Sequence, residues 1–195
     1  MTVPGPLTTA NQVTLLRMLL IPAFVILVID GRLGWALVVF STAGITDAFD
    51  GLIARRSGQK SSLGAWLDPM ADKLLLVSTF VVLTAPGLGL ANRLPIWLTA
   101  LIISRDVGIV ITVAIVNLAV GRRTFSPSIF GKIATATYIV TAVMAMLFNY
   151  RGYHSAVVDL CVYASLAITL VSGLHYIWHA ARIIDQSAHD DALML

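Results

Sequence analysis

Six apolar runs, each long enough to cross a lipid bilayer as a helix, take up most of this chain. They cover residues 13–29, 34–54, 65–85, 94–120, 129–149 and 155–181. A helix needs about 20 apolar residues to cross the hydrocarbon core. Residues that favour turns separate the runs, as at 30–32, 86–89 and 126–127. We therefore predict an all-α integral membrane protein with six transmembrane helices.

The composition supports this prediction. Hydrophobic residues make up 58% of the chain and charged residues only 12%, whereas soluble domains carry about 25% charged residues. The net charge of +3 suits an anionic membrane surface or an anionic substrate better than nucleic acid. The single cysteine, Cys161, excludes an internal disulfide and a cysteine-based zinc site.

Basic residues in the loops predict the orientation, because lysine and arginine collect on the cytoplasmic side of a membrane. The loops at 56–62 and 121–127, together with Arg182, carry five basic residues, against three in the loops on the other side. Both termini are then cytoplasmic: a juxtamembrane segment at 1–12, a membrane domain at 13–183 and a polar, frayed tail at 184–195. Four tryptophans fall near the span ends, as in an interfacial aromatic belt: Trp35, Trp66, Trp97 and Trp178.

The start of the chain bears on the compartment. No basic segment precedes the first apolar run, and Arg17 interrupts that run. We therefore expect no cleavable signal or transit peptide, and a bacterial cytoplasmic (inner) membrane as the location.

Two aspartates lie inside the second apolar run, where an ionised carboxylate costs about 2.5–3.5 kcal/mol on insertion scales. Asp47 and Asp50 are three residues apart, so they share one face of a helix. Gly51 and Ala54 extend that face with small side chains, which let a bulky ligand approach the backbone. Arg55 follows one turn after Gly51, where its cation could meet a phosphate.

A second acidic face follows a short basic loop. Gly64, Asp68 and Asp72 are spaced by four residues each, which places them on one face of the next predicted helix. Helices joined by so short a loop are antiparallel neighbours, so the acidic faces can converge. Four carboxylates repel one another unless cations neutralise them, and hard oxygen ligands select Mg²⁺, Mn²⁺ or Ca²⁺. Two alternatives stay open: a single intramembrane Asp also suits an ion or proton pathway, and Asp68 could simply cap a helix before Pro69.

Eight residues of these two runs form a single spaced pattern: Asp47-x-x-Asp50-Gly51-x-x-Ala54-Arg55, then, after eight residues, Gly64-x-x-x-Asp68-x-x-x-Asp72. The pattern resembles the signature of the CDP-alcohol phosphatidyltransferase family at all eight positions. The number and spacing of the apolar runs extend the resemblance over nearly the whole chain.

The resemblance implies a six-helix membrane enzyme, paired as a homodimer, with a polar active-site cavity open to the cytoplasm. It implies that Asp47, Asp50, Asp68 and Asp72 hold two divalent cations, Mg²⁺ or Mn²⁺. Asp72 would also be the general base for the acceptor hydroxyl. The CDP-lipid would bind at four further motif positions: Gly51, Ala54, Arg55 and Gly64.

Two further segments fit the family pattern. Asn11, Thr14 and Arg17 resemble its N-terminal motif near the nucleotide, although Ala10 stands where many members have proline. Arg105 and Lys132 resemble acceptor-binding positions in the branches that make phosphatidylglycerophosphate and cardiolipin. The alternative for Arg105 is charge pairing inside the membrane, for instance with Asp106.

The resemblance implies transfer of a phosphatidyl group from CDP-diacylglycerol to an alcohol, with release of CMP. Glycerol 3-phosphate is the leading acceptor and phosphatidylglycerol is its nearest rival, while inositol phosphate and serine rank lower. An ion or proton transporter is the alternative from a different class of protein. It predicts ion flux without nucleotide.

Overall fold

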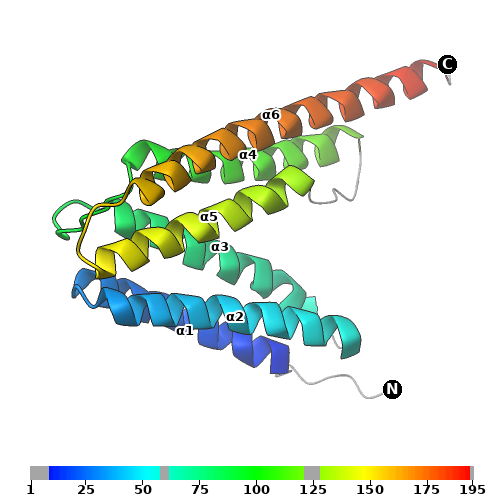
Figure 1. Cartoon of the computed structure of the whole chain (residues 1–195). Coiled ribbons are helices and arrows are strands. Elements are labelled where there is room, and N and C mark those ends of the chain that lie inside the picture. Colours follow the sequence, from blue (N-terminus) through cyan, green and yellow to red (C-terminus); the bar gives the residue numbers. More distant parts are fainter. Residues whose placement is uncertain (1–8, 58–61, 121–127, 194–195) are drawn as a thin grey trace. The chain divides into compact units, whose positions relative to one another are not determined.

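The computed structural model describes residues 9–57, 62–120 and 128–193, with side chains at 15–46, 70–116, 118, 128–179 and 181–182. The described residues form six helices and no strand (Figure 1). The helices are α1 (Thr9–Ile29), α2 (Leu33–Ser57), α3 (Ser62–Thr84), α4 (Ile96–Val120), α5 (Ile129–Tyr150) and α6 (Ala156–Leu193). The prediction of an all-α fold is confirmed for these described residues.

Three helices contain segments long and apolar enough to cross a membrane. Within the described part of the chain these segments are Ile96–Val116, Ile129–Tyr150 and Ala156–His179. Shorter apolar segments, Leu15–Ile29 and Leu33–Thr46, lie in α1 and α2. Large apolar side chains stay exposed on these helices, for example Leu19 and Leu174. Such a surface is stable against lipid tails rather than water, which indicates an integral membrane protein.

The chain divides into two compact units, and the boundary falls inside α5. One unit comprises Met1–Leu94 with Ala142–Ser155, and the other comprises Pro95–Thr141 with Ala156–Leu195. We refer to them as the first and second units. The membrane domain predicted for residues 13–183 spans both of them.

In the first unit, α1 packs against both α2 and α3. Phe24 of α1 and Phe40 of α2 are buried, with ring centroids 5.9 Å apart. Val28 and Ala36 are also buried, and the small Ala36 lets the helices approach closely. Both helices that carry the acidic pattern therefore share α1 as a neighbour.

A buried asparagine pair closes the loops at one end of the first unit. The backbone N–H of Asn92 donates to Asn149 Oδ1 at 2.6 Å, and Asn149 Nδ2 donates to the Asn92 carbonyl at 3.2 Å. Asn92 Nδ2 donates to the Tyr153 carbonyl, and the N–H of Ser155 donates to Asn92 Oδ1, both at 2.8 Å. Asn92 thus joins the loop after α3 to the end of α5 and the loop that follows it.

In the second unit, α4 packs against α6, and hydroxyl groups connect α5 to α6. The Tyr138 hydroxyl lies 2.6 Å from Thr169 Oγ1, and Thr141 Oγ1 lies 2.8 Å from Ser165 Oγ. All four side chains are buried. In a membrane such hydrogen bonds hold helices together where lipid tails offer no polar partner.

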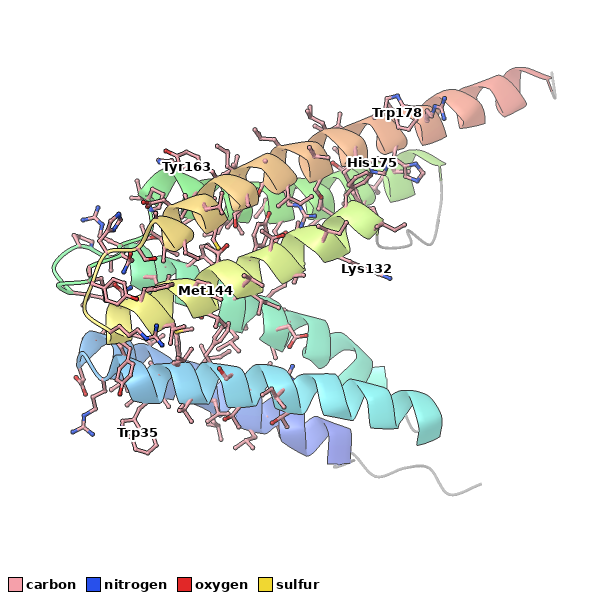
Figure 2. The ribbon with its side chains drawn as sticks, in the orientation of Figure 1. Trp35, Lys132, Met144, Tyr163, His175 and Trp178 are labelled. Carbon is pink, nitrogen blue, oxygen red and sulfur yellow. The ribbon has the colours of Figure 1, made fainter. Side chains whose placement is uncertain are left out.

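Helix α6 continues well beyond its apolar segment, as far as Leu193. The tail predicted to be frayed is therefore helical as far as Leu193, because the backbone hydrogen bonds of α6 continue past its apolar segment. Trp178 lies near the end of the apolar segment, and Trp35 lies in the first turn of α2; both point outward (Figure 2). Their positions and exposure agree with an interfacial belt.

Candidate active site

The backbone carries the eight-residue acidic pattern on two unbroken helices. Helix α2 runs through the part from Asp47 to Arg55, and α3 runs through the part from Gly64 to Asp72. The three- and four-residue spacings therefore place each set on one helix face, as predicted. Seven of the eight positions lie outside the residues whose side chains are described: Asp47, Asp50, Gly51, Ala54, Arg55, Gly64 and Asp68.

Asp72 is the position of the pattern whose side chain is described, and it pairs with Arg17 of α1. The guanidinium of Arg17 donates through Nη1 to Asp72 Oδ1. Arg17 is buried, with 3% of its side chain exposed, whereas Asp72 is 47% exposed. A buried arginine needs a charged partner, since an isolated charge in a low-dielectric environment is costly. The pair brings the N-terminal motif and the acidic pattern together.

The other two residues of the N-terminal motif lie earlier on the same helix. Asn11 and Thr14 fall within α1, six and three residues before Arg17 respectively, but outside the described side chains. Their spacing on a continuous helix puts Asn11, Thr14 and Arg17 near one face. Whether they touch a nucleotide stays a prediction.

Arg105 belongs to the second unit and is held between two partners. Its Nη1 donates to Asp106 Oδ1 at 2.8 Å, and its Nη2 donates to Ser172 Oγ of α6 at 2.6 Å. Only 8% of the side chain is exposed. The alternative considered for Arg105, charge pairing with Asp106, is thus observed, and its role in binding the acceptor stays a prediction.

The environment of Arg105 leaves part of its donor capacity unused. Its Nε is buried and has no hydrogen-bond partner among the described residues. Gly131 of α5 lies against the guanidinium, because a Cβ at that position would come within 3.3 Å of Arg105 Nη2. A guanidinium has five N–H donors, so Arg105 is fixed in place without being saturated.

Lys132, the other predicted acceptor residue, lies in the first turn of α5 and is exposed. Figure 2 shows its side chain extending away from the helix. It directly follows Gly131, the residue that lies against the guanidinium of Arg105. Ser172 is the residue that sequence reasoning missed. A serine within an apolar run is usually interpreted as a small packing residue. Its hydrogen bond to Arg105 depends on how α4 and α6 pack.

A divalent cation needs several oxygen ligands, and Asp72 is the one predicted ligand whose side chain is described. No group of three or more His, Cys, Asp or Glu residues gathers among the side chains described. Asp72 alone represents the acidic set there, because the other three aspartates fall outside. The predicted four-aspartate site therefore remains a prediction.

Comparison with known proteins assigns the family. The family model for CDP-alcohol phosphatidyltransferase matches residues 7–177, which include both helices of the acidic pattern as well as Arg17 and Arg105. The chain belongs to the CDP-alcohol phosphatidyltransferase family. The resemblance inferred from the spacing of the aspartates is confirmed, and membership favours phosphatidyl transfer over ion transport.

Individual relatives cover most of the chain. A probable phosphatidylglycerophosphate synthase of Mycobacterium tuberculosis is 35% identical over 184 residues, 90% of this chain and 82% of that protein. A CMP-forming cardiolipin synthase of Streptomyces coelicolor is 30% identical over 191 residues, 91% of this chain and 85% of that protein. The human CMP-forming cardiolipin synthase is 30% identical over 194 residues, 91% of this chain and 63% of that protein.

Proposed function

We propose that this phosphatidyltransferase moves the phosphatidyl group of CDP-diacylglycerol to glycerol 3-phosphate, in phospholipid biosynthesis. The products are phosphatidylglycerophosphate and CMP. The similarity to the mycobacterial protein, a probable phosphatidylglycerophosphate synthase, carries this proposal. Arg105 supports it, because a fixed and unsaturated guanidinium suits the phosphate of a small anionic acceptor.

In the proposed arrangement all six helices cross the inner membrane and the acidic pattern faces the cytoplasm. The apolar segments of α1 and α2 support two of these crossings. The basic loops at 56–62 and 121–127 support the orientation. Pairing as a homodimer, which the family resemblance implies, belongs to the same proposal.

The donor set fits two divalent cations, Mg²⁺ or Mn²⁺. Carboxylate oxygens are the hard ligands that these ions prefer, and the exposed part of Asp72 leaves its carboxylate accessible. Asp47, Asp50, Asp68 and Asp72 would hold the ions. When bound, such ions neutralise charge on the pyrophosphate and on the departing CMP.

The protein's own residues have distinct roles in the proposed transfer. The acceptor oxygen forms a new bond to the phosphorus that carries diacylglycerol, and the bond from that phosphorus to the CMP oxygen breaks. The carboxylate of Asp72 takes the hydroxyl proton of the acceptor. Arg17 orients that carboxylate through the observed ion pair.

The remaining predicted positions would bind the CDP-lipid. Gly51, Ala54 and Gly64 offer little side-chain bulk beside the cytidine and its phosphates, and Arg55 would pair with the diphosphate. Asn11 and Thr14 would complete the nucleotide site from α1. Arg105 and Lys132 would bind the acceptor.

The acceptor assay tests the proposal. The purified full-length protein is given CDP-diacylglycerol and Mg²⁺ with glycerol 3-phosphate, phosphatidylglycerol, inositol phosphate or serine, and CMP release is measured. We expect glycerol 3-phosphate to support the fastest release and a chelator to stop it. Release with phosphatidylglycerol instead would make the protein a cardiolipin synthase, and no release with any alcohol would contradict the proposal.

A matched pair of arginine variants tests the acceptor site. Arg105→Gln should raise the KM for glycerol 3-phosphate at least about tenfold, the effect of losing one charged hydrogen bond, while the KM for CDP-diacylglycerol stays unchanged. Arg151→Gln, an exposed loop arginine, is the control and should change neither constant. An equal rise in both KM values for Arg105→Gln would remove Arg105 from the acceptor site.

A further inference from the structure

An open groove lies where α2 begins, in the first unit. It has a volume of about 690 Å³ and is lined by the α1–α2 turn, the first turns of α2 and the last turn of α5. Its walls include Arg32, Trp35, Leu37, Val38, Leu147 and Tyr150. None of these residues belongs to the acidic pattern, the N-terminal motif or the Arg105 site.

A glycine lets the two walls of the groove meet. A Cβ on Gly34 would lie only 2.8 Å from Tyr150 Cε2, so the tyrosine ring rests directly on the backbone of α2. Tyr150 is the last residue of α5 and Gly34 the second residue of α2. The start of α2 and the end of α5 therefore lie at the same level.

The groove lies far along α2 from the acidic pattern. Asp47 follows Leu33 by 14 residues, which corresponds to about 21 Å along a helix axis. That distance is most of the hydrocarbon thickness of a bilayer, about 30 Å. If the aspartates lie near one membrane surface, the groove lies at the other.

The groove changes in chemistry along its length. Arg32, Trp35 and Tyr150 lie at its outer end, and all three are exposed. Val38 and Leu147 lie deeper, each three residues further along its helix than Trp35 or Tyr150, which is about 4.5 Å further into the span. Aromatic residues at the level of the headgroups, with apolar residues below them, match the layering of a lipid leaflet.

Arg32 gives the outer end a positive charge. It forms no ion pair within the part of the chain that the structure describes, and Asp30, the nearest acid in sequence, does not line the groove. An arginine at the membrane surface attracts anionic lipid headgroups and can bind a phosphate through two N–H groups.

We propose that this groove binds a phospholipid with an anionic headgroup. The headgroup phosphate pairs with Arg32 beside Trp35 and Tyr150, and an acyl chain follows Val38 and Leu147 toward the bilayer centre. The inference rests on the proposed crossing of the membrane by α2, and it does not depend on the transfer chemistry.

Photolabelling tests the site on the full-length protein in detergent. The probes are phosphatidylglycerol and phosphatidylcholine analogues with a photoreactive group in the acyl chain, and labelled peptides are identified by mass spectrometry. We expect phosphatidylglycerol to label the segments 31–38 and 147–150 about fivefold more than phosphatidylcholine, as one surface cation would favour. Arg32→Gln should abolish that preference, whereas Arg93→Gln, an exposed arginine outside the groove, should keep it.

Two further measurements separate the possible occupants. Val38→Trp should block the apolar part and reduce labelling by both lipids, while inorganic phosphate should not compete if the ligand is a lipid. The proposal would be overturned if Arg32→Gln did not change the labelling, or if inorganic phosphate displaced the lipid probe. A switch from dimer to monomer in Val38→Trp without loss of lipid would assign the groove to a second copy of the chain instead.

CMP release, measured in the same samples, keeps the two proposals distinct. Arg32-dependent labelling by a protein that releases no CMP would leave the lipid groove standing and contradict the proposed function. Normal CMP release with labelling that is independent of Arg32 would support the proposed function and contradict the lipid groove.

Discussion

Arg17 and Asp72 are 55 positions apart in the chain, yet they form an ion pair between α1 and α3. Each could be selected from the sequence, because an ionisable residue inside an apolar run is costly unless it has a function. Their contact could not be predicted, since it depends on how α1 packs against α3. The sequence therefore identified each residue as a functional candidate, but it did not predict that the two form an ion pair.

Asp72→Asn tests the proposed base directly. The amide cannot take up the acceptor proton, so CMP release should fall by about 10²–10⁴-fold, the usual contribution of general acid–base catalysis. CDP-diacylglycerol binding should change little, because Asn keeps the size of the side chain. Turnover is measured as CMP release, and affinity is measured as binding of the CDP-lipid, both on the purified protein.

The control for this variant is Asp159→Asn, which changes an exposed aspartate in the first turn of α6. It should keep near-native turnover. Near-native turnover in Asp72→Asn as well would show that another group takes the proton.

Asn92 should be important for stability although it lies outside the site. Asn92→Ala removes two side-chain hydrogen bonds and leaves the Tyr153 carbonyl and the Ser155 N–H without their observed partner. A buried group left unsatisfied costs about 1–3 kcal/mol, so thermal unfolding in detergent should move to a clearly lower temperature. Arg93→Ala, at the exposed neighbouring position, should unfold at the native temperature. Equal melting of the two variants would count against a stabilising role for Asn92.

At the scale of elements, apolar run lengths predicted the helices well and their ends less well. The run 129–149 became α5, Ile129–Tyr150, whereas 34–54 became α2, Leu33–Ser57, and 155–181 became α6, Ala156–Leu193. Hydropathy predicts which part of a helix can lie in lipid. The helix itself ends where its backbone hydrogen bonds end. Hydropathy therefore does not detect the polar helical turns of α6 that follow Trp178.

The hydroxyl contacts between α5 and α6 allow an element-scale prediction. Tyr138→Phe and Thr169→Val each remove one side of a buried hydrogen bond of 2.6 Å. A double-mutant cycle should give a coupling of about 0.6 kcal/mol and no more than about 1.7, the range for hydrogen bonds between membrane helices. The measurement is unfolding of the four proteins in the same detergent. A coupling of zero would mean that the hydroxyl groups find equal partners when separated.

At the scale of the whole molecule, the sequence predicted an all-helical membrane protein of this family but not its division into two units. The acidic pattern and Arg17 belong to the first unit, while Arg105 and Ser172 belong to the second. Run lengths are local quantities and say nothing about which helices pack together. For the same reason, Ser172 could not be assigned to Arg105 before α4 and α6 were seen to pack.

The exposed apolar surface predicts how the intact protein fractionates. The protein should remain in the membrane pellet after an alkaline carbonate wash and should dissolve only when detergent is added, because transmembrane helices are effectively irreversibly inserted. A peripheral membrane protein expressed in the same cells is the control, and the wash should release it. Recovery of this chain in the carbonate supernatant would contradict the proposed crossings.

The hydrogen bonds of Asn92 limit where a segment can be inserted into the loop between α3 and α4. Asn92 is bonded on several sides, and the N–H of Leu94 donates to the Leu83 carbonyl, so these two positions tolerate little change. Just before them, Gly87 and Gly89 have positive φ values and are exposed. An epitope tag inserted between these glycines should leave the fold intact, and antibody access in sealed vesicles would then report on which side of the membrane this loop lies.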